Sequence, residues 1–243
     1  MSEIIKVENV TTGYGVQGKN SPIITDVSFS MLRGETLGLA GESGSGKTTI
    51  ARAMLGLIPV WSGKIEKNVS KMQMVFQDPY GSLNPSKTVS WILQEPLRLE
   101  NNKDKEMRLK EVDRIMDLVE LDAELKERRP GELSGGQRQR VCLAAALMQN
   151  PDFLIADEPV SALDVTIQAQ VLSLLKKIQK ERNLTILFIS HDLRTMYHFC
   201  DKIVVLRNGR VEEIGEPESM YRHPQTEYTG LLLKSAGIYR DSK

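Results

Sequence analysis

One glycine-rich segment constrains the fold of this chain more than any other feature. Gly41-Glu42-Ser43-Gly44-Ser45-Gly46-Lys47-Thr48 matches the pattern G-x-x-x-x-G-K-[ST] in full. The apolar run 36–40 precedes it, and a helical pattern begins near Lys47. Between a strand and a helix, such a loop lets backbone N–H groups converge on phosphate oxygens, and the helix N-terminus adds positive potential. The segment therefore predicts an α/β fold whose loop binds the phosphates of a nucleotide; the alternative is a structural Gly-Ser turn.

Length and composition exclude several other classes of protein. The 243 residues suffice for one large α/β domain, or for a core with a small subdomain. The 32 basic residues balance 32 acidic ones, which argues against nucleic acid as a partner. The two cysteines, Cys142 and Cys200, are expected to be buried reduced thiols. The longest apolar runs fall below the roughly 20 residues that a membrane-spanning helix needs, so a partner would have to span any membrane.

Strand and helix patterns alternate along most of the chain. They predict strands at 4–10, 23–31, 36–40, 153–156 and 185–189, with a glycine-rich loop after Val10. They predict helices over about 103–121, from Ser134 to about Asn150 and over 167–178, and a hairpin that turns at Asn208-Gly209. A compact helical insert is expected between about residues 84 and 150. Strands that alternate with helices imply a mostly parallel sheet with helices on both faces.

An acidic pair follows the predicted strand 153–156. Asp157 and Glu158 stand at its carboxyl end, where the ligands of open α/β sheets bind. Lys47 should reach the β- and γ-phosphates, and the Thr48 hydroxyl should ligate Mg²⁺, which Asp157 is placed to hold through water. Glu158 is the candidate general base for the attacking water. The alternative, an acidic pair that only caps a helix, is disfavoured by the phosphate loop in the same chain.

A second helix start carries phosphate-binding chemistry. In Leu133-Ser134-Gly135-Gly136-Gln137, Ser134 and Gln137 form a capping-box pattern that begins a helix. A helix N-terminus with two glycines and a hydroxyl is also an anion site. Because the chain already has a phosphate loop, a second such terminus suggests that two chains face each other. Each would then supply one terminus to the nucleotide of the other.

The order of these motifs resembles that of the ABC ATPases. The phosphate loop, Gln77, Leu-Ser-Gly-Gly-Gln, Asp157-Glu158, Ser161-Ala162-Leu163-Asp164 and His191 occur in the order that defines this family, over essentially the whole chain. The resemblance implies the P-loop NTPase fold of ABC ATPases: a RecA-like parallel sheet core, an N-terminal antiparallel β subdomain and a helical subdomain. It implies one nucleotide-binding domain over 1–243, with the α/β core at 1–83 and 151–215, the helical subdomain at 84–150 and a tail at 216–243.

The resemblance also implies roles for individual residues, with ATP and Mg²⁺ as cofactors. Tyr14 would stack on adenine, Gln77 would contact Mg²⁺ or the lytic water, and His191 would contact the γ-phosphate. Asp164 would lie at the seam between two cassettes. The expected catalytic residues are Lys47, Gln77, Glu158 and His191. The expected metal ligands are Thr48, Gln77 and Asp157. The expected ATP-binding residues are Tyr14, Gly41, Glu42, Ser43, Gly44, Ser45, Gly46, Lys47, Thr48, Thr49, Ser134, Gly135, Gly136, Gln137 and Asp164.

Four further stretches, at 76–85, 162–170, 200–203 and 223–229, resemble the peptide and nickel importer subfamily of these ATPases. Longer peptide-importer members carry a cysteine-rich C-terminal segment, whereas this sequence stops at Lys243 without one. That difference favours the shorter type, which resembles nickel or metal-chelate importer ATPases.

The expected function is an ATP-hydrolysing subunit that powers the import of peptides, nickel or metal chelates. Its expected partners are a second cassette (a paralogue rather than an identical chain), two transmembrane permease subunits and an extracellular or periplasmic substrate-binding protein, without nucleic acid. Its expected location is peripheral, on the cytoplasmic face of the cell membrane. One alternative is a soluble, non-transport ABC ATPase of DNA repair, chromosome structure or translation, although such proteins usually carry tandem cassettes or a long coiled coil. The other, a small-molecule or nucleotide kinase, would leave Leu-Ser-Gly-Gly-Gln unexplained.

Overall fold

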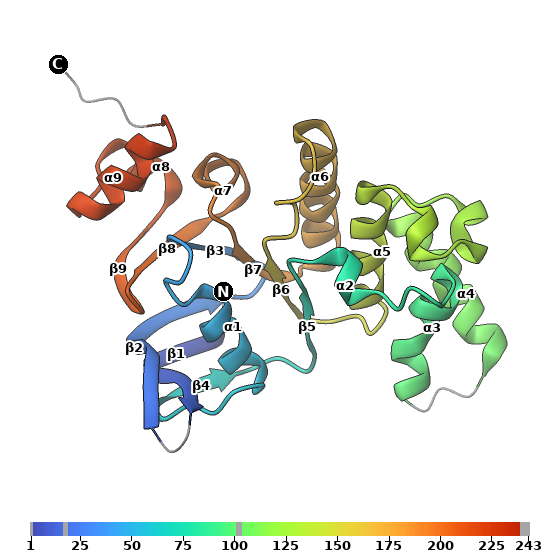
Figure 1. The fold of residues 1–243 in the computed structure, drawn as a ribbon, viewed down its shortest axis with the longest axis horizontal. Helices are drawn as coiled ribbons and strands as arrows, with labels where there is room; N and C mark the ends of the chain where they lie inside the picture. The colour runs from blue at the N-terminus through green and yellow to red at the C-terminus, as the bar shows by residue number, and fades with distance from the viewer. Residues whose placement is uncertain (1, 17–18, 101–103, 239–243) are drawn as a thin grey trace. The chain divides into compact units, whose positions relative to one another are not determined.

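The structure is a computed structural model that describes residues 2–16, 19–100 and 104–238. It divides into two units, one formed by Met1–Val69 with Thr185–Lys243 and the other by Ser70–Leu184 (Figure 1). Each unit combines strands with helices, which confirms the predicted α/β class. The predicted subdomain boundaries at 84 and 150 stay predictions.

The first unit contains a three-stranded antiparallel sheet in the order β2-β1-β4 (Figure 1). Its strands are β1 (Glu3–Val16), β2 (Lys19–Leu32) and β4 (Ser62–Lys67). Ile5, Val7 and Val10 of β1 are buried and supply its part of the core. The sequence predicted a glycine-rich loop after Val10, and this was wrong. Strand β1 continues to Val16 because its backbone keeps pairing with β2 as far as Lys19.

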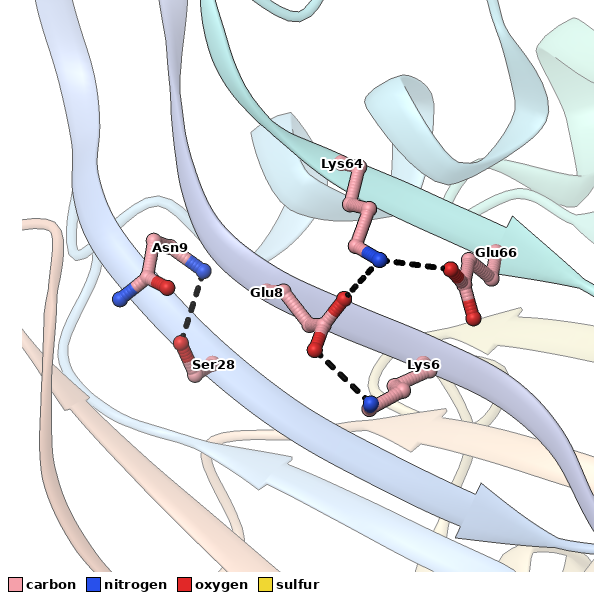
Figure 2. Close-up of polar contacts among 6 residues, drawn as sticks. All are labelled: Lys6, Glu8, Asn9, Ser28, Lys64 and Glu66. Carbon is pink, nitrogen blue, oxygen red and sulfur yellow. Dashed lines mark hydrogen bonds and ion pairs between the residues drawn. The ribbon is translucent and has the colours of Figure 1, made fainter.

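Charged side chains fix the pairing of β1 with β4, as Figure 2 shows. Glu8 lies opposite Lys64 and Lys6 lies opposite Glu66 in this antiparallel pair. The Glu8 carboxylate is 2.8 Å from both the Lys6 and the Lys64 Nζ atoms, and Lys64 Nζ is 2.7 Å from Glu66 Oε1. The two lysines lower the pKa of Glu8 below its usual range. Opposite charges across a strand pair favour this register over a shifted one.

A β-bulge at Asn9 interrupts the same strand. Asn9 has a φ of 48°, in the left-handed region that asparagine tolerates better than most residues. Its backbone N–H donates to Ser28 Oγ at 2.8 Å (Figure 2), and its side chain donates to Asp26 Oδ1 at 2.8 Å. The bulge therefore keeps its polar groups paired while the ladder changes register between Val7 and Val10.

The first unit also contains strands in the order β7-β3-β8-β9. These are β3 (Thr36–Ala40), β7 (Thr185–Ile189), β8 (Lys202–Arg207) and β9 (Arg210–Gly215). Strand β3 pairs in parallel with both β7 and β8, and β8 and β9 form the predicted antiparallel hairpin. All five residues of β3 and all five of β7 are buried, which explains their apolar sequences.

Four helices accompany these strands in the described part of the first unit. They are α1 (Lys47–Leu55), α7 (Leu193–Phe199), α8 (Pro217–Arg222) and α9 (Glu227–Ser235). Helix α1 begins at Lys47, as predicted.

The second unit contains the parallel pair β5 (Met72–Val75) and β6 (Phe153–Asp157). Its helices are α2 (Pro79–Ser82), α3 (Val89–Leu99), α4 (Lys105–Leu118), α5 (Gly135–Leu147) and α6 (Val165–Arg182), with 3₁₀ turns at Ala123–Glu127 and Pro130–Glu132. Helix α4 buries Val112, Ile115 and Met116, so its amphipathic character is confirmed.

Two helix boundaries differ from the predicted ones. Helix α4 begins at Lys105 because the Asp104 carboxylate caps it, accepting from the Glu106 and Met107 N–H groups; residue 103 lies outside the described residues. Helix α5 ends at Leu147, before the predicted end near Asn150. Both cysteines are buried, as predicted. Within the ranges that the structure describes, no helix is both long and apolar enough to cross a membrane.

Candidate functional site

The glycine-rich loop lies between β3 and α1 in the first unit, as predicted. Gly46 is the N-cap of α1 and has no side chain with which to cap the helix, so the N-terminal turn presents backbone donors and positive potential. Lys47 is 7% exposed, and its Nζ donates to the backbone oxygens of Gly41 and Glu42, each at 2.8 Å. The ammonium group is thus held inside the loop, where an anionic ligand could take over its hydrogen bonds.

Two further features of the loop suit a phosphate. Gly41 has a φ of 144°, and a Cβ atom there would lie 2.3 Å from the backbone oxygen of Leu206. Only glycine lets the loop backbone pass this close to the end of β8. The Ser45 hydroxyl is buried and has no hydrogen-bond partner among the described residues. Because a buried hydroxyl without a partner is costly, this atom fits a loop that receives a polar ligand.

His191 lies near the same edge of the sheet as the loop. Strands β3 and β7 are parallel, with Leu39 opposite Ile189, so both end at that edge. His191 is exposed and follows β7 by two residues. The next residue, Asp192, caps α7, and its N–H donates to Ser190 Oγ at 2.9 Å. The bonds made by Ser190 and Asp192, the residues before and after His191, fix the backbone that carries it.

Tyr14 lies on β1 with 38% of its surface exposed. Its hydroxyl accepts a hydrogen bond of 3.0 Å from Arg52 Nη1, on the helix that follows the phosphate loop. The ring therefore has a fixed anchor at its hydroxyl end. Sequence reasoning missed Arg52, because a polar residue in a helix gives no signal of a partner on a distant strand.

The second unit brings together three of the predicted residues. Asp157 is the last residue of β6 and is 4% exposed, and Glu158 follows it. Because β5 and β6 are parallel, with Val75 opposite Ala156, Gln77 emerges beside the acidic pair. Gln77 Nε2 donates to Glu158 Oε2 at 3.2 Å.

The backbone of Glu158 was not foreseen from the sequence. Its φ of 47° lies in the left-handed region, which costs a non-glycine residue about 1 kcal/mol or more. The Ser161 hydroxyl and backbone N–H both donate to the Glu158 backbone oxygen, at 3.1 and 3.3 Å, and stabilise this turn. Strained residues of this kind concentrate at functional sites.

The predicted capping box at the start of α5 is confirmed. Ser134 Oγ accepts from the Gln137 N–H at 3.3 Å, and Gln137 Oε1 accepts from the Ser134 N–H at 2.9 Å. A Cβ atom on Gly136 would lie 2.5 Å from Ile167 Cγ2, so α6 approaches closely here. Asp164 caps α6, accepting from the Thr166 and Ile167 N–H groups at 3.1 and 3.0 Å. The starts of α5 and α6, with their predicted site residues, therefore lie side by side.

Cys142 lies on the inner side of α5. Its Sγ atom is 3.6 Å from the backbone oxygen of Pro79, and 8% of the residue is exposed. Burial, with a smaller contribution from the Asp78 carboxylate, raises the pKa of the Cys142 thiol to about 12. This cysteine is therefore a structural residue that stays protonated.

The described residues contain no group of three or more His, Cys, Asp and Glu side chains that could hold a metal ion. Of the predicted metal ligands, the first unit holds the Thr48 hydroxyl, and the second unit holds the Asp157 carboxylate and the Gln77 amide. Each is an oxygen donor of the kind that suits Mg²⁺, which is commonly bound through one or two carboxylates together with the phosphates of a substrate.

Comparison with known proteins gives concordant results. The family model described as ABC transporter matches residues 24–161. The oligopeptide transport ATP-binding protein OppF of Streptococcus pyogenes serotype M1 is 43% identical over 256 residues, which cover 98% of this chain and 83% of that protein. The structure of cbiO1 from Clostridium perfringens, described as part of the ABC transporter complex cbiONQ, is similar with a TM-score of 0.82 and 27% identity, covering 98% of each chain. A dimeric post-hydrolysis structure of the ATP-binding cassette MJ0796, bound to ADP and Pi, is similar with a TM-score of 0.76 and 27% identity, covering 88% of this chain and 99% of that chain.

Proposed function

Because the chain belongs to the ABC transporter family, as an ATP-hydrolysing subunit, we propose that it powers the import of peptides. The observation that carries the substrate class is the 43% identity to an oligopeptide transport ATP-binding protein over 98% of this chain. Peptides are therefore preferred to nickel and metal chelates, which the sequence also left open. The non-transport alternative is not favoured, since this relative is itself a transport protein.

ATP would be held mainly by the first unit. The loop from Gly41 to Thr49 would surround the phosphates, with Lys47 exchanging its bonds to the Gly41 and Glu42 oxygens for bonds to the β- and γ-phosphates. Tyr14, anchored by Arg52, would stack on adenine. Thr48, Gln77 and Asp157 would hold Mg²⁺, which when bound neutralises charge on the phosphates.

Hydrolysis would depend on Glu158 as the general base. Its carboxylate would accept the proton of the attacking water, a role that is typically worth about 10²–10⁴-fold in rate. Gln77, which donates to this carboxylate at 3.2 Å, would orient the base and the water. His191 would contact the γ-phosphate, and Lys47 would stabilise charge on it as the bond breaks.

A second cassette would complete the site. Its residues equivalent to Ser134, Gly135, Gly136 and Gln137 would close over the γ-phosphate, with Asp164 at the seam, and exclude bulk water. The similarity to a dimeric cassette supports this arrangement. We propose that the second cassette is a paralogue, and that the pair binds two permease subunits on the cytoplasmic face of the membrane, which receive peptide from an external binding protein.

Substitution of Glu158 by Gln tests the catalytic assignment. The purified E158Q chain should bind ATP and dimerise with it, while hydrolysis falls about a hundredfold or more because the amide cannot accept the proton. Glu95→Gln, the same change at an exposed position on α3, should keep wild-type activity. Unchanged turnover in E158Q would remove Glu158 from the role of base, and a wild-type chain that binds no ATP would refute the proposal as a whole.

The substrate class needs a separate experiment. The tagged chain, expressed at native level, should co-purify from detergent-solubilised membranes with permease subunits and a second cassette. The binding protein associated with those permeases should bind peptides in a calorimetric titration and should not bind nickel or metal chelates. Binding of a metal chelate in place of peptide would overturn the substrate assignment while leaving the ATPase assignment intact.

A further inference from the structure

The turn of the β8–β9 hairpin contacts the phosphate loop directly. The Gly209 N–H donates to the backbone oxygen of Ser45 at 3.1 Å, and the Gly209 oxygen accepts from the Thr25 N–H at 2.8 Å. Gly209 has a φ of 73°, and a Cβ atom there would lie 1.8 Å from the backbone oxygen of Ile23. The turn therefore lies between β2 and the loop, and there is no room for a side chain at Gly209.

The C-terminal helix α9 is tied to the same hairpin. The Glu213 carboxylate of β9 is 8% exposed and accepts from the Gln225 and Thr226 N–H groups at 3.1 and 3.3 Å. The Thr226 hydroxyl in turn caps α9, accepting from the Thr229 N–H at 3.2 Å. A buried carboxylate with two backbone donors holds the start of α9 in a fixed position relative to β9.

Tyr228, in the first turn of α9, lies near the other end of the loop. Its ring packs against the Arg207 guanidinium, 4.6 Å from the ring centroid. Its side chain and Glu42 line the same cavity, and burial raises the pKa of its hydroxyl. This cavity has a volume of about 490 Å³ and lies between the loop and α9, and its lining also includes Ser43, Gly44 and Leu231.

We propose that the β8–β9 turn and α9 hold the phosphate loop in the conformation that receives ATP, with Gly209 and Tyr228 as positioning residues. The loop contains several glycines, so its conformational freedom must be restricted before its N–H groups can converge on phosphate. Gly209 would restrain it at Ser45, to whose backbone oxygen it donates, and Tyr228 would restrain it near Glu42, with which it lines the cavity. Ordering the loop in advance lowers the entropic cost of binding, so loss of either contact should weaken ATP binding. The proposal rests on the proposed function of the loop.

Tyr228→Phe tests the restraint at Glu42, because it keeps the ring against Arg207 and removes only the hydroxyl. KM for ATP, and the Kd for trinitrophenyl-ATP measured without hydrolysis, should rise about three- to tenfold, as expected for the loss of one polar contact. The kcat at saturating ATP and the Tm should stay close to those of the wild type. Tyr197→Phe is the matched control, since Tyr197 lies in α7 and its ring contacts His198 and Tyr221 instead.

Gly209→Ala tests the restraint at Ser45. Its control is Gly56→Ala, which adds the same left-handed strain at a φ of 77° but meets no atom within 4 Å. Gly209→Ala should raise the Kd for trinitrophenyl-ATP about tenfold more than Gly56→Ala does; if it fails to fold, Tyr228→Phe decides. An unchanged KM and Kd in Tyr228→Phe, or a fall in Tm alone, would overturn the positioning role while the wild type still binds ATP. A wild-type chain that binds no nucleotide would instead refute the proposed function.

Discussion

Ser134 has two separable roles that one substitution can measure. Within its own chain it is the N-cap of α5, and we propose that it also contacts the γ-phosphate held by a second cassette. In Ser134→Ala the Gln137 N–H loses an acceptor at 3.3 Å, while the reciprocal bond from the Ser134 N–H to Gln137 remains. Loss of an N-cap oxygen costs about 1 kcal/mol of folding free energy. For a chain of this size that corresponds to a fall in Tm of about 2–4 °C.

Loss of the phosphate contact would have a much larger effect. A domain with about 5–15 kcal/mol of stability stays folded at 25 °C after losing about 1 kcal/mol, so the capping loss alone should hardly change the measured rate. Removal of a donor to charge that develops in a transition state costs about 10²–10³-fold in kcat. Ser134→Ala should therefore lower steady-state ATP turnover by that order while lowering Tm by only a few degrees.

Thr88→Ala is the matched control for this prediction. Thr88 caps α3 in the same unit, and its hydroxyl also accepts from the N–H three residues on, that of Trp91, at 3.3 Å. The two variants should lose similar stability in thermal unfolding, but only Ser134→Ala should lose turnover at saturating MgATP. Equal turnover in the two variants would show that Ser134 does no more than begin a helix, and the two-chain site would have to be abandoned.

Three further predictions follow, one from the contact between Arg52 and Tyr14 and two from the burial of Cys142. Because Arg52 Nη1 donates to the Tyr14 hydroxyl, Arg52→Ala and Tyr14→Phe should each raise KM for ATP about two- to fivefold, and the double variant no further; additive effects would refute the anchoring role. Because the pKa of Cys142 is raised to about 12, a Cys200→Ser chain should react with iodoacetamide at pH 8.5 about a hundredfold more slowly when native than in urea. The folded state keeps this proton more tightly than the unfolded state, so Cys142 also makes stability fall as pH rises from about 8.5 toward 12, which pH-dependent unfolding would measure. Equal alkylation rates in the two states would contradict the burial of this thiol.

The buried strands were the part of the fold that the sequence predicted best. β3, β6 and β7 are short, mainly apolar segments in which every residue is buried, so their composition is sufficient to identify them. Local signals also located the hairpin at Asn208-Gly209 and the capping box at Ser134. In each case, residues a few positions apart determine the local structure.

Elements that depend on distant partners were missed. Strand β4 has the sequence Ser-Gly-Lys-Ile-Glu-Lys and is mostly exposed, so it shows no clear alternation of apolar residues. It is stabilised by its ladder to β1 and by the ion pair between Lys64 and Glu8. Helix α3 was obscured by Pro96 in its interior, which a local reading takes as a helix end. A sequence window of a few residues shows neither the strand with which β4 pairs nor the tertiary packing of α3.

The same distinction applies within the candidate site. The type of each chemical group could be predicted from motifs, since a phosphate loop needs glycines and a lysine, and a general base needs a carboxylate. The contacts that hold those groups in place could not be predicted, because Arg52, Gly209 and Tyr228 contact residues that are remote in sequence. Glu158 is the clearest case: the chain keeps glutamate at a φ of 47°, where glycine would be less strained. A position that accepts backbone strain to retain a carboxylate is better explained by the chemistry of that carboxylate than by the stability of the fold.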